Sequence, residues 1–471
     1  MPAETEVEKV TAVVKVFGVS FASRTLILIL TEALLLLLAL VASVVLWFGR
    51  DADLALAYDH STPALLLACG VCILCMYYYD LYESSVLWNS HELVPRLVQV
   101  LGTASIALAL VYFVYPPVQL GRGPFALWIL LAGAGLAVWR RFFAALNSTV
   151  GWKEAVAILG DSPLAHELAE ELRRRPEIGL ELRGYVDIGD GARLSGLTRR
   201  LGGLEEIEDL LRRERIHRLV IAMGERRGRL PVEELLRLKA RGLQVQEAAE
   251  LYEAITGKVP VLALRPSSLL FSEGFMASRS MVVAKRAVSI AASLIGLLLG
   301  APAMALAALL IRLDSPGPAL FRQRRVGRDG KIFTLYKFRT MRAEADPELP
   351  AQPDDERITR VGRWLRRTRF DELPQLWNIL RGDMDFIGPR PFLPKTEHEL
   401  ASRIPLYTQR WNVRPGITGW AQVHNGYCAT LEDNIEKLGY DLFYIRHMSV
   451  GLDLLILFHT SKILLLGRGA R

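Results

Sequence analysis

The chain has 471 residues, of which 51% are hydrophobic and 23% are charged, and its mean hydropathy is +0.24. So much apolar surface excludes an intrinsically disordered chain, and only four cysteines exclude a disulfide-built secreted module. The formal net charge is +7, so the positions of the arginines matter more than their sum.

Four apolar segments before residue 150 predict a membrane-embedded helical bundle over residues 25–150. They cover residues 25–48, 63–79, 93–115 and 125–146. A helix needs about 20 residues to cross the hydrocarbon core, and the second segment reaches that length only with its flanks. A bundle of buried soluble helices is the alternative. It is less favoured because aromatic residues cluster at the segment ends, as in the interfacial belts of membrane proteins.

Basic residues around these segments predict their orientation. Those that flank the first and fourth segments are Lys9, Lys15, Arg24, Arg140, Arg141 and Lys153. By the positive-inside rule, both ends of the bundle are expected in the cytoplasm. Residues 1–24 would then form a cytoplasmic N-terminus, and everything after residue 150 would lie in the cytoplasm or on the membrane surface.

Residues 151–265 alternate short apolar runs with helical stretches, which predicts a small Rossmann-like α/β domain with a parallel sheet. The first run is followed by Gly160-Asp161-Ser162-Pro163. The further glycines of a dinucleotide-binding loop are missing from this stretch. A cofactor-free structural or regulatory domain is therefore favoured over a dinucleotide site.

A fifth apolar segment, residues 287–311, is long enough to cross a membrane. Both of its flanks are basic, with Lys285 and Arg286 in front and several arginines behind, so a full crossing would export a basic flank. Pro302 lies in the middle, where a proline removes a backbone hydrogen bond and kinks a helix. These features predict a re-entrant helix over about residues 282–312 that bends at Pro302 and returns to the same membrane face.

The region behind this segment is strongly basic. Residues 357–369 hold six arginines and no acid, and five of the six repeat at helical spacing: Arg357, Arg360, Arg363, Arg366 and Arg367. This spacing places most guanidinium groups on one helix face. Such a face can bind anionic lipid, nucleic acid or a polyphosphate substrate. Nucleic acid is disfavoured because the region follows a membrane element and contains no recognisable nucleic-acid-binding module.

Asp371 and Glu372 follow this basic block directly. They could simply pair with neighbouring arginines, or they could be catalytic. In the catalytic interpretation, nearby arginines hold Asp371 ionised at neutral pH, and its carboxylate attacks phosphorus to give an acyl phosphate. A carboxylate beside it can hold Mg²⁺ together with substrate phosphates. The residues alone favour neither interpretation, although Arg390, between two prolines, is a rigid fork suited to phosphate.

Longer motifs in this region resemble those of a known family. They are Phe370–Asn378 (FDELPQLWN), Gly382–Met384 (GDM), Gly388–Pro391 (GPRP) and Arg414–Gln422 (RPGITGWAQ). In this order they resemble the signature series of the bacterial sugar transferases, which are polyprenyl-phosphate hexose-1-phosphate transferases. The resemblance covers residues 280–471. The spans and the α/β domain in front are similar to the large WbaP-like members, and the C-terminal end is similar to the branch found with exosortase-linked exopolysaccharide systems.

The resemblance implies a fold and a reaction. The fold combines a four-span membrane helical bundle, a small Rossmann-like α/β domain and an α-rich monotopic catalytic domain with a re-entrant helix. The reaction moves a sugar-1-phosphate from a UDP-sugar to undecaprenyl phosphate and leaves undecaprenyl-diphosphate-sugar and UMP. It is the first membrane step of exopolysaccharide or O-antigen synthesis. The implied location is the bacterial inner (cytoplasmic) membrane, with the catalytic domain on the cytoplasmic face.

The matching positions also imply residue roles. Asp371 is implied as the nucleophile that forms a covalent phosphosugar intermediate. Glu372 is implied as the Mg²⁺ ligand, with Asp383 as a further candidate, and Pro302 as the break in the re-entrant helix. The candidates for binding substrate phosphates and the nucleotide are Lys337, Arg339, Arg366, Arg390, Arg414, Gly416 and Thr418.

Two positions depart from the family pattern. Ala301 stands where Ser commonly precedes the helix-breaking proline, which removes a hydroxyl that could bond the broken backbone. Asp385 stands where Ser is usual after Gly-Asp-Met, which adds a negative charge near the expected metal.

The expected partners are a UDP-sugar, undecaprenyl phosphate, membrane lipid and a second copy of the chain in a homodimer; no nucleic acid is expected. Two other functions compete with the transferase. A non-catalytic membrane scaffold would have no need of the Asp371–Glu372 pair. A Mg²⁺-dependent hydrolase of prenyl diphosphates should release sugar or phosphate instead of UMP. No residue in the sequence selects a particular hexose.

Overall fold

The computed structural model describes residues 13–16, 19–56, 61–82, 90–149, 153–189, 193–224, 230–263, 279–342, 355–424 and 430–465. The chain divides into two compact units, one built around Ser20–Val245 and the other around Gln246–Arg471. The predicted α/β domain extends to residue 265. In the structure, helix α10 (Ala248–Thr256) falls in the second unit. Residues Gly467–Arg471, at the C-terminal end that resembles the exosortase-linked branch, lie outside the described residues.

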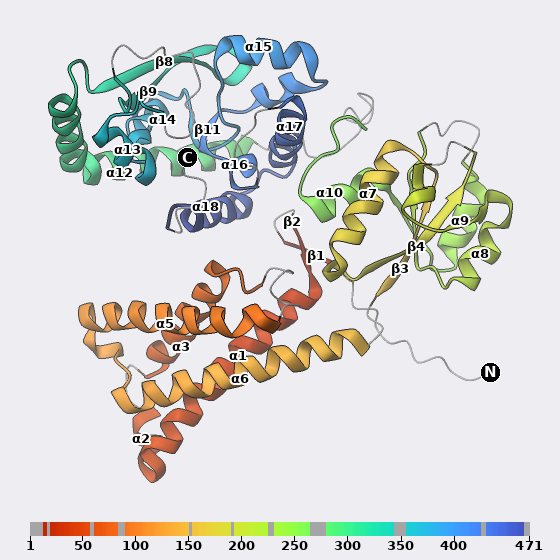
Figure 1. Cartoon of the computed structure of the whole chain (residues 1–471), viewed down its shortest axis with the longest axis horizontal. Helices are drawn as coiled ribbons and strands as arrows, with labels where there is room; N and C mark the ends of the chain where they lie inside the picture. The colour runs from red at the N-terminus through yellow and green to blue at the C-terminus, as the bar shows by residue number, and fades with distance from the viewer. Residues whose placement is uncertain are drawn as a thin grey trace. The chain divides into compact units, whose positions relative to one another are not determined.

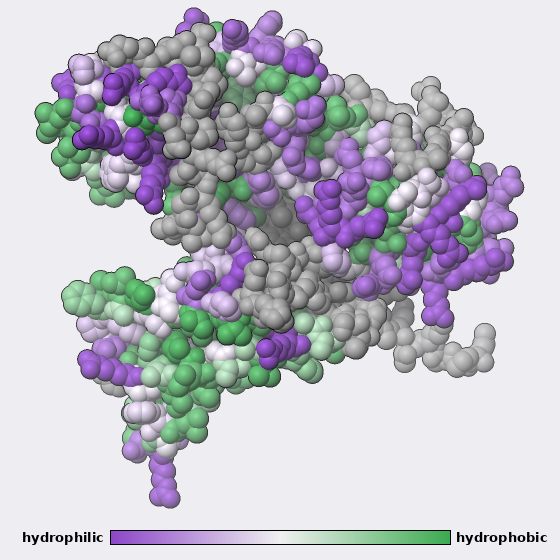
Figure 2. All heavy atoms as spheres, viewed as in Figure 1, coloured by the Kyte–Doolittle hydropathy of each residue, from purple (hydrophilic) through white to green (hydrophobic). Residues whose placement is uncertain are grey.

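The first unit contains a bundle of apolar helices that follows two short strands, β1 (Val13–Val16) and β2 (Val19–Ala22) (Figure 1). The helices are α1 (Ser23–Phe48), α2 (Ala52–Leu56), α3 (Ser61–Tyr78), α5 (Ser90–Val114) and α6 (Arg122–Thr149). Leu36 and Leu40 of α1 are completely buried, whereas Leu34 and Leu38 are more than half exposed. Figure 2 shows hydrophobic side chains over most of the visible face of the bundle. Such a surface suits contact with lipid.

All four predicted spans are helices in the structure. Three of them, in α1, α5 and α6, are long and apolar enough to cross a membrane, as is one helix of the second unit, Arg279–Asp314. The second predicted span is the shorter apolar helix Thr62–Tyr78, which agrees with its limited apolar length in the sequence. This is the helix content of a membrane protein.

A buried ion pair joins α1 to α6. Arg140 donates from Nε to Glu32 Oε1 at 2.7 Å and from Nη2 to Glu32 Oε2 at 3.1 Å. Its Nη1 donates to the Leu81 carbonyl at 2.7 Å. Arg140 was predicted to be one of the basic residues that flank the apolar segments. The structure corrects this, because Arg140 lies inside the bundle and neutralises the acid of the first span.

We expect Glu32→Gln to lower the free energy of unfolding of the bundle by about 3–5 kcal/mol, because it leaves the Arg140 charge buried and unpaired. The unfolding midpoint in detergent would measure this loss. Glu170→Gln removes an exposed ion pair with Arg174 and should cost less than about 1 kcal/mol. Equal, small shifts in the two variants would contradict the role given to the buried pair.

A five-stranded sheet forms the rest of the first unit (Figure 1). Its strand order is β5 (Arg200–Gly203), β4 (Leu180–Asp187), β3 (Glu154–Leu159), β6 (Arg218–Ile221) and β7 (Gln244–Glu247). The β3–β4, β3–β6 and β4–β5 pairs are parallel. The accompanying helices are α7 (Pro163–Arg174), α8 (Ile207–Arg213) and α9 (Val232–Ala240). The predicted α/β domain with a parallel sheet is confirmed.

The loop after β3 uses its own side chains to satisfy backbone donors. Asp161 is buried, and its Oδ1 accepts a hydrogen bond from Leu194 N at 3.0 Å. The Ser162 hydroxyl accepts one from Ala165 N at 3.2 Å and so caps α7. A dinucleotide-binding loop offers its N–H groups to phosphates, whereas here the Ser162 side chain occupies one of them, Ala165 N, and Asp161 bonds a more distant segment at Leu194.

The second unit is rich in helices. They are α10 (Ala248–Thr256), α12 (Arg279–Asp314), α13 (Arg360–Thr368), α14 (Gln375–Arg381), α15 (Pro394–Arg403), α16 (Trp420–His424), α17 (Leu431–Arg446) and α18 (Val450–Leu465). Its strands form an antiparallel pair, β8 (Leu320–Val326) with β9 (Ile332–Phe338), and a parallel pair, β10 (Asp385–Ile387) with β11 (Gly416–Thr418). The main core gathers around α17, where Leu442, Phe443 and Tyr444 are buried.

The segment after α10 is part of this core. Val259 N donates to the Gly439 carbonyl at 3.0 Å, and Trp420 Nε1 donates to the Gly257 carbonyl at 2.8 Å. Glu253 pairs with Arg446 at 2.7 Å. These contacts explain why α10 belongs with the second unit although it follows the α/β sheet directly in sequence.

Helix α12 is an apolar helix that changes direction along its length (Figure 1). Its first half packs on α14, where a Cβ atom at Gly296 would lie 3.0 Å from Leu376 Cδ1. Its second half packs on α13, where Ile311 and Leu365 belong to one buried cluster. Between these contacts its outer face carries exposed leucines, among them Leu298 at 77%. Both halves therefore contact the same domain while one face remains apolar and uncovered.

Candidate active site

The acidic pair lies on a tight turn between α13 and α14. Asp371 and Glu372 belong to the 3₁₀ turn η7 (Phe370–Glu372). The preceding Arg369 has a φ of +58°, a left-handed conformation that ends α13 and reverses the chain. Both carboxylates are buried, with 8% and 7% of their surfaces exposed.

Three cations hold the Glu372 carboxylate. Its Oε1 lies 3.2 Å from Lys337 Nζ and 3.0 Å from Arg390 Nη2, and Arg369 Nη1 is 3.8 Å away. Burial alone would raise the pKa of Glu372, but Arg390 and then Lys337 outweigh it and hold that pKa well below its usual range. Glu372 is therefore ionised at neutral pH and draws together β9 and the Pro-Arg-Pro loop.

Asp371 has a different environment. Its Oδ1 is buried and has no hydrogen-bond partner among the described residues. Burial raises the pKa of Asp371; Lys337 opposes this rise and Glu372 adds to it. The net shift of the Asp371 pKa is upward, because burial outweighs the lowering by Lys337, Arg366 and Arg369. A buried acceptor without a donor costs free energy, and such groups concentrate at functional sites.

Of the predicted phosphate-binding residues, Lys337, Arg366 and Arg390 lie at this pair. Lys337 and Arg390 bond Glu372 directly. Arg366 donates from Nε to Thr340 Oγ1 at 2.9 Å. Burial lowers the pKa of Arg366, and Asp371 is the first charge that opposes this effect. The predicted arginine stripe is also refined, since Arg357 precedes α13 and pairs with Asp355 at 2.6 Å.

Arg339, another of the predicted phosphate-binding residues, contacts backbone carbonyls with both terminal nitrogens of its guanidinium group. Its Nη1 donates to the Pro316 carbonyl at 2.6 Å, and its Nη2 donates to the carbonyls of Ser315 at 2.7 Å and Ile311 at 3.4 Å. These are carbonyls at and just beyond the C-terminal end of α12, which have no partner within the helix and carry its negative dipole end. Arg339 therefore caps α12.

We expect Arg339→Gln to lower the free energy of unfolding by about 1–3 kcal/mol, because buried carbonyls lose their donors. The Michaelis constant for a UDP-sugar should stay unchanged within about twofold. Unfolding in detergent and steady-state kinetics would measure the two quantities. A rise in that constant without a loss of stability would instead indicate direct substrate contact by Arg339.

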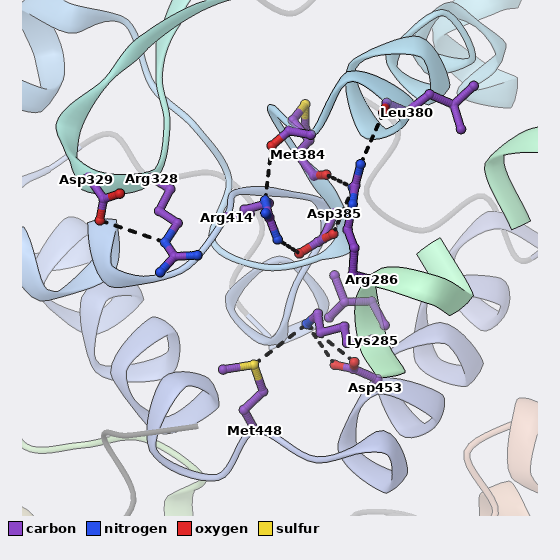
Figure 3. Close-up of polar contacts among 12 residues, drawn as sticks. Lys285, Arg286, Arg328, Asp329, Leu380, Met384, Asp385, Arg414, Met448 and Asp453 are labelled. Carbon is purple, nitrogen blue, oxygen red and sulfur yellow. Dashed lines mark hydrogen bonds and ion pairs between the residues drawn. The ribbon is translucent and has the colours of Figure 1, made fainter. Parts of the chain in front are cut away.

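Arg414 braces the loop that precedes β10 (Figure 3). Its Nε donates to the Gly382 carbonyl at 3.0 Å, and its Nη1 lies 3.8 Å from Asp385 Oδ2. Arg286, at the start of α12, lies on the other side of Asp385 at 3.4 Å and donates to the Met384 carbonyl at 3.2 Å. The unusual negative charge of Asp385 is thus neutralised by two arginines, and it joins the base of α12 to this loop.

The two remaining predicted residues support the backbone. A Cβ atom at Gly416 would lie 2.1 Å from Gly388 N, so no side chain fits there. The Gly416 N–H donates to the Pro389 carbonyl at 3.0 Å. Thr418 Oγ1 lies 2.7 Å from Thr460 Oγ1 of α18. These residues hold the Pro-Arg-Pro loop and α18 in place, and no contact joins them to the acidic pair.

Asp371 and Glu372 fit Mg²⁺ better than Asp383, the further candidate for a ligand, does. Among the described residues, no three His, Cys, Asp or Glu side chains gather closely enough to hold a metal ion. Asp383 is engaged elsewhere, with its Oδ2 3.2 Å from Asn378 Nδ2 and 3.5 Å from Arg381 Nε. Mg²⁺ commonly binds through one or two carboxylates completed by water and substrate phosphates. Asp371, with its unpaired oxygen, and Glu372 meet that requirement.

Sequence reasoning missed three residues of this site. Arg369 both turns the chain and pairs with Glu372. Gln375, one helical turn after Asp371, is 3% exposed, and its Nε2 lacks a partner among the described residues. Asn378 links β9 to α14, since its Oδ1 accepts from Tyr336 N at 3.0 Å. Gln375 and Asn378 lie in the family-like motif Phe370–Asn378, and Arg369 ends the arginine block before it; only packing assigns them these contacts.

Two family models match parts of this chain. Residues 280–467 match the family model described as "Bacterial sugar transferase", and residues 78–230 match one described as "CoA-binding domain". The UDP-glucose:undecaprenyl-phosphate glucose-1-phosphate transferase of Escherichia coli K12 is 34% identical over 355 residues, 71% of this chain and 73% of that protein. Its Xanthomonas campestris counterpart is 31% identical over 418 residues, 83% of this chain and 84% of that protein.

A third relative differs in the sugar of its name. The UDP-N-acetylgalactosamine-undecaprenyl-phosphate N-acetylgalactosaminephosphotransferase of Aeromonas hydrophila is 41% identical over 239 residues. That alignment covers 50% of this chain, and the chain spans about half, 56%, of the relative's length.

Proposed function

This chain belongs to the bacterial sugar transferases, and we propose that it transfers a sugar-1-phosphate from a UDP-sugar to undecaprenyl phosphate, giving undecaprenyl-diphosphate-sugar and UMP. The observation that carries the proposal is the buried Asp371 Oδ1, which has no hydrogen-bond partner among the described residues. The cations Lys337, Arg366 and Arg369 lie close enough to lower the pKa of Asp371 against the effect of burial. A stable fold gains nothing from an unpaired buried carboxylate oxygen, whereas a nucleophile requires one.

In the proposed first step, an Asp371 oxygen attacks the phosphorus that bears the sugar. A new oxygen–phosphorus bond forms, the bond from that phosphorus to the bridging oxygen breaks, and UMP leaves with the bonding electrons. In the second step an oxygen of undecaprenyl phosphate attacks the same phosphorus. The Asp371 carboxylate is then released, and the diphosphate-linked sugar is formed.

The basic residues would stabilise the charge that builds up on the phosphoryl oxygens. Arg390 bonds Glu372 while 30% of its side chain remains exposed, so it can also donate to phosphate. Lys337 and Arg366 reach the acidic pair from β9 and α13. Such pre-positioned donors contribute more in a buried site than in water. Glu372 and Asp371 would hold Mg²⁺, which neutralises charge on the diphosphate.

We further propose that α12 is a re-entrant helix and that the second unit acts on the cytoplasmic face of the bacterial cytoplasmic membrane. Its Arg286 end and its Arg339-capped end both contact the same domain, and Pro302 lies in the middle of the helix. A returning helix would keep both contacts on one side. It would place the acidic pair at headgroup depth, where the acceptor phosphate lies.

Incubating the purified full chain with undecaprenyl phosphate, Mg²⁺ and a panel of UDP-sugars tests this function. Release of UMP together with a sugar-linked lipid supports the transferase. In a parallel assay with undecaprenyl diphosphate, release of phosphate by a protein that releases no UMP from UDP-sugars would favour a hydrolase of prenyl diphosphates. Absence of turnover with every UDP-sugar, in protein shown to be folded, would favour a membrane scaffold.

A further inference from the structure

The loop that carries Arg390 is anchored through its backbone carbonyls. Four successive carbonyls, those of residues 389–392, each accept a hydrogen bond from a different residue elsewhere in the domain. The donors are Gly416 N at 3.0 Å, Arg410 Nη2 at 2.8 Å, Arg325 Nη1 at 3.0 Å and Val326 N at 3.2 Å. Two donors are side chains, and both are arginines that the proposed chemistry does not use.

Arg410 is the more deeply buried of these two anchors. It lies in the 3₁₀ helix η8 (Tyr407–Asn412) and is 4% exposed. Its Nη1 donates to Glu397 Oε1 at 2.9 Å and to the Tyr407 hydroxyl at 2.7 Å. Its Nη2 donates to Asp441 Oδ2 at 3.0 Å as well as to the Arg390 carbonyl. Two buried acids from α15 and α17 thus fix the guanidinium plane behind the loop.

Glu397 also binds the loop that carries Arg390 directly. Glu397 Oε1 accepts from Phe392 N at 3.2 Å, and its Oε2 accepts from Trp411 Nε1 at 2.9 Å. Arg325 approaches from β8, and its Nε and Nη2 bond Gln323 Oε1 at 3.1 and 2.6 Å. The loop backbone is therefore clamped from both sides, while the Arg390 side chain points toward Glu372.

The planar fork of arginine is required at these positions. Arg410 must satisfy two carboxylates, a hydroxyl and a carbonyl from one rigid plane, and a lysine ammonium is a single point charge that cannot span them. A loss of the carbonyl contact would let the loop shift. Misplacement by about 1 Å can lower a reaction rate by about 10²-fold even when the change lies away from the reacting atoms.

We propose that Arg410, together with Arg325, is a positioning residue of the transfer reaction: it holds the Arg390 backbone so that the Arg390 guanidinium lies at Glu372 and at the substrate phosphates. This inference rests on the proposed function, since it takes Arg390 as a phosphate contact. Arg410 bonds Arg390 only through its backbone carbonyl, so it acts on the phosphate contact through the loop.

A double-mutant cycle tests whether Arg410 acts through Arg390. We expect Arg410→Lys to lower the turnover number for UMP release about 10- to 100-fold, with the Michaelis constant for UDP-sugar changed less than about threefold. In an Arg390→Gln background, the same Arg410→Lys change should cost less than about twofold. Arg403→Lys makes the same substitution at an exposed arginine of α15 that pairs with Glu399 at 3.6 Å; it serves as the matched control, with turnover expected within about twofold of the parent.

The cycle also has outcomes that overturn the proposal. If the losses from Arg410→Lys and Arg390→Gln multiply, or if Arg403→Lys lowers turnover as much as Arg410→Lys, the network is only structural. If Arg410 variants do not fold, Arg325→Lys replaces them, because it releases the next carbonyl of the same loop and should show the same coupling. Asp371→Asn in the same assay keeps the two proposals apart, since full activity of that variant would overturn the proposed function whatever the cycle reports.

Discussion

Replacing Asp371 with Asn is expected to lower the rate of UMP release by about 10⁴-fold or more, in line with the loss of a nucleophile in other covalent enzymes. The amide is nearly isosteric, so packing around η7 should be preserved. It is a poor nucleophile, and its NH₂ group would place a donor where the carboxylate leaves an unpaired acceptor. The chemical step is therefore expected to fail while the fold survives.

The most direct measurement is trapping of the enzyme-bound phosphosugar. With a UDP-sugar labelled in the phosphate nearest the sugar and no acceptor lipid, the parent protein should take up label on Asp371, and Asp371→Asn should take up none. Asp383→Asn is the matched control, because that carboxylate lies near Asn378 and Arg381 and away from the pair. Labelling of Asp371→Asn at the parental level would rule out Asp371 as the nucleophile.

Glu372→Gln is expected to lower both activity and stability. The carboxylate is the shared partner of Lys337, Arg390 and Arg369, so its neutralisation leaves buried positive charges without a counter-charge. Removing one member of a buried ion pair costs about 3–5 kcal/mol. Activity should fall by about 10²–10³-fold in addition, because the donors aimed at the phosphates lose their alignment.

Unfolding in detergent and turnover at several Mg²⁺ concentrations would measure these effects. Glu372→Asp keeps the charge on a shorter side chain, so it should retain most of the stability while losing turnover and needing more Mg²⁺. Parental stability of Glu372→Gln would contradict the role of the carboxylate as the shared ion-pair partner of Lys337, Arg390 and Arg369. An unchanged Mg²⁺ requirement in both variants would contradict its role as a ligand.

The acidic pair and Arg390 could be predicted from the sequence because their signals are local. Asp371 and Glu372 are adjacent, and Arg390 is held by prolines on both sides, so a short stretch of chain reveals them. The membrane helices were predictable for the same reason, since a run of apolar residues reports its own hydropathy. The parallel α/β sheet followed from the alternation of short segments.

The contacts that the sequence did not reveal are those in which a side chain finds its partner far along the chain. Arg339 contacts residues up to 28 positions away, Arg414 contacts Gly382 32 positions away, and Thr418 contacts Thr460 42 positions away. Arg140 and Glu32 are 108 residues apart. A family-like motif predicts that such residues matter, but the direction in which each side chain points depends on packing.

The sequence by itself determined the membrane bundle, the α/β module and the chemistry that one acidic pair can perform among arginines, because each depends on residues that are neighbours in the chain. Only the tertiary structure decided which cations reach the pair, that Glu372 takes the ion pairs, and that Asp371 remains buried and without a hydrogen bond among the described residues. The burial of a side chain and the charges around it depend on segments that are distant in sequence. This is why burial can raise the pKa of Asp371 although its neighbours in the chain are basic.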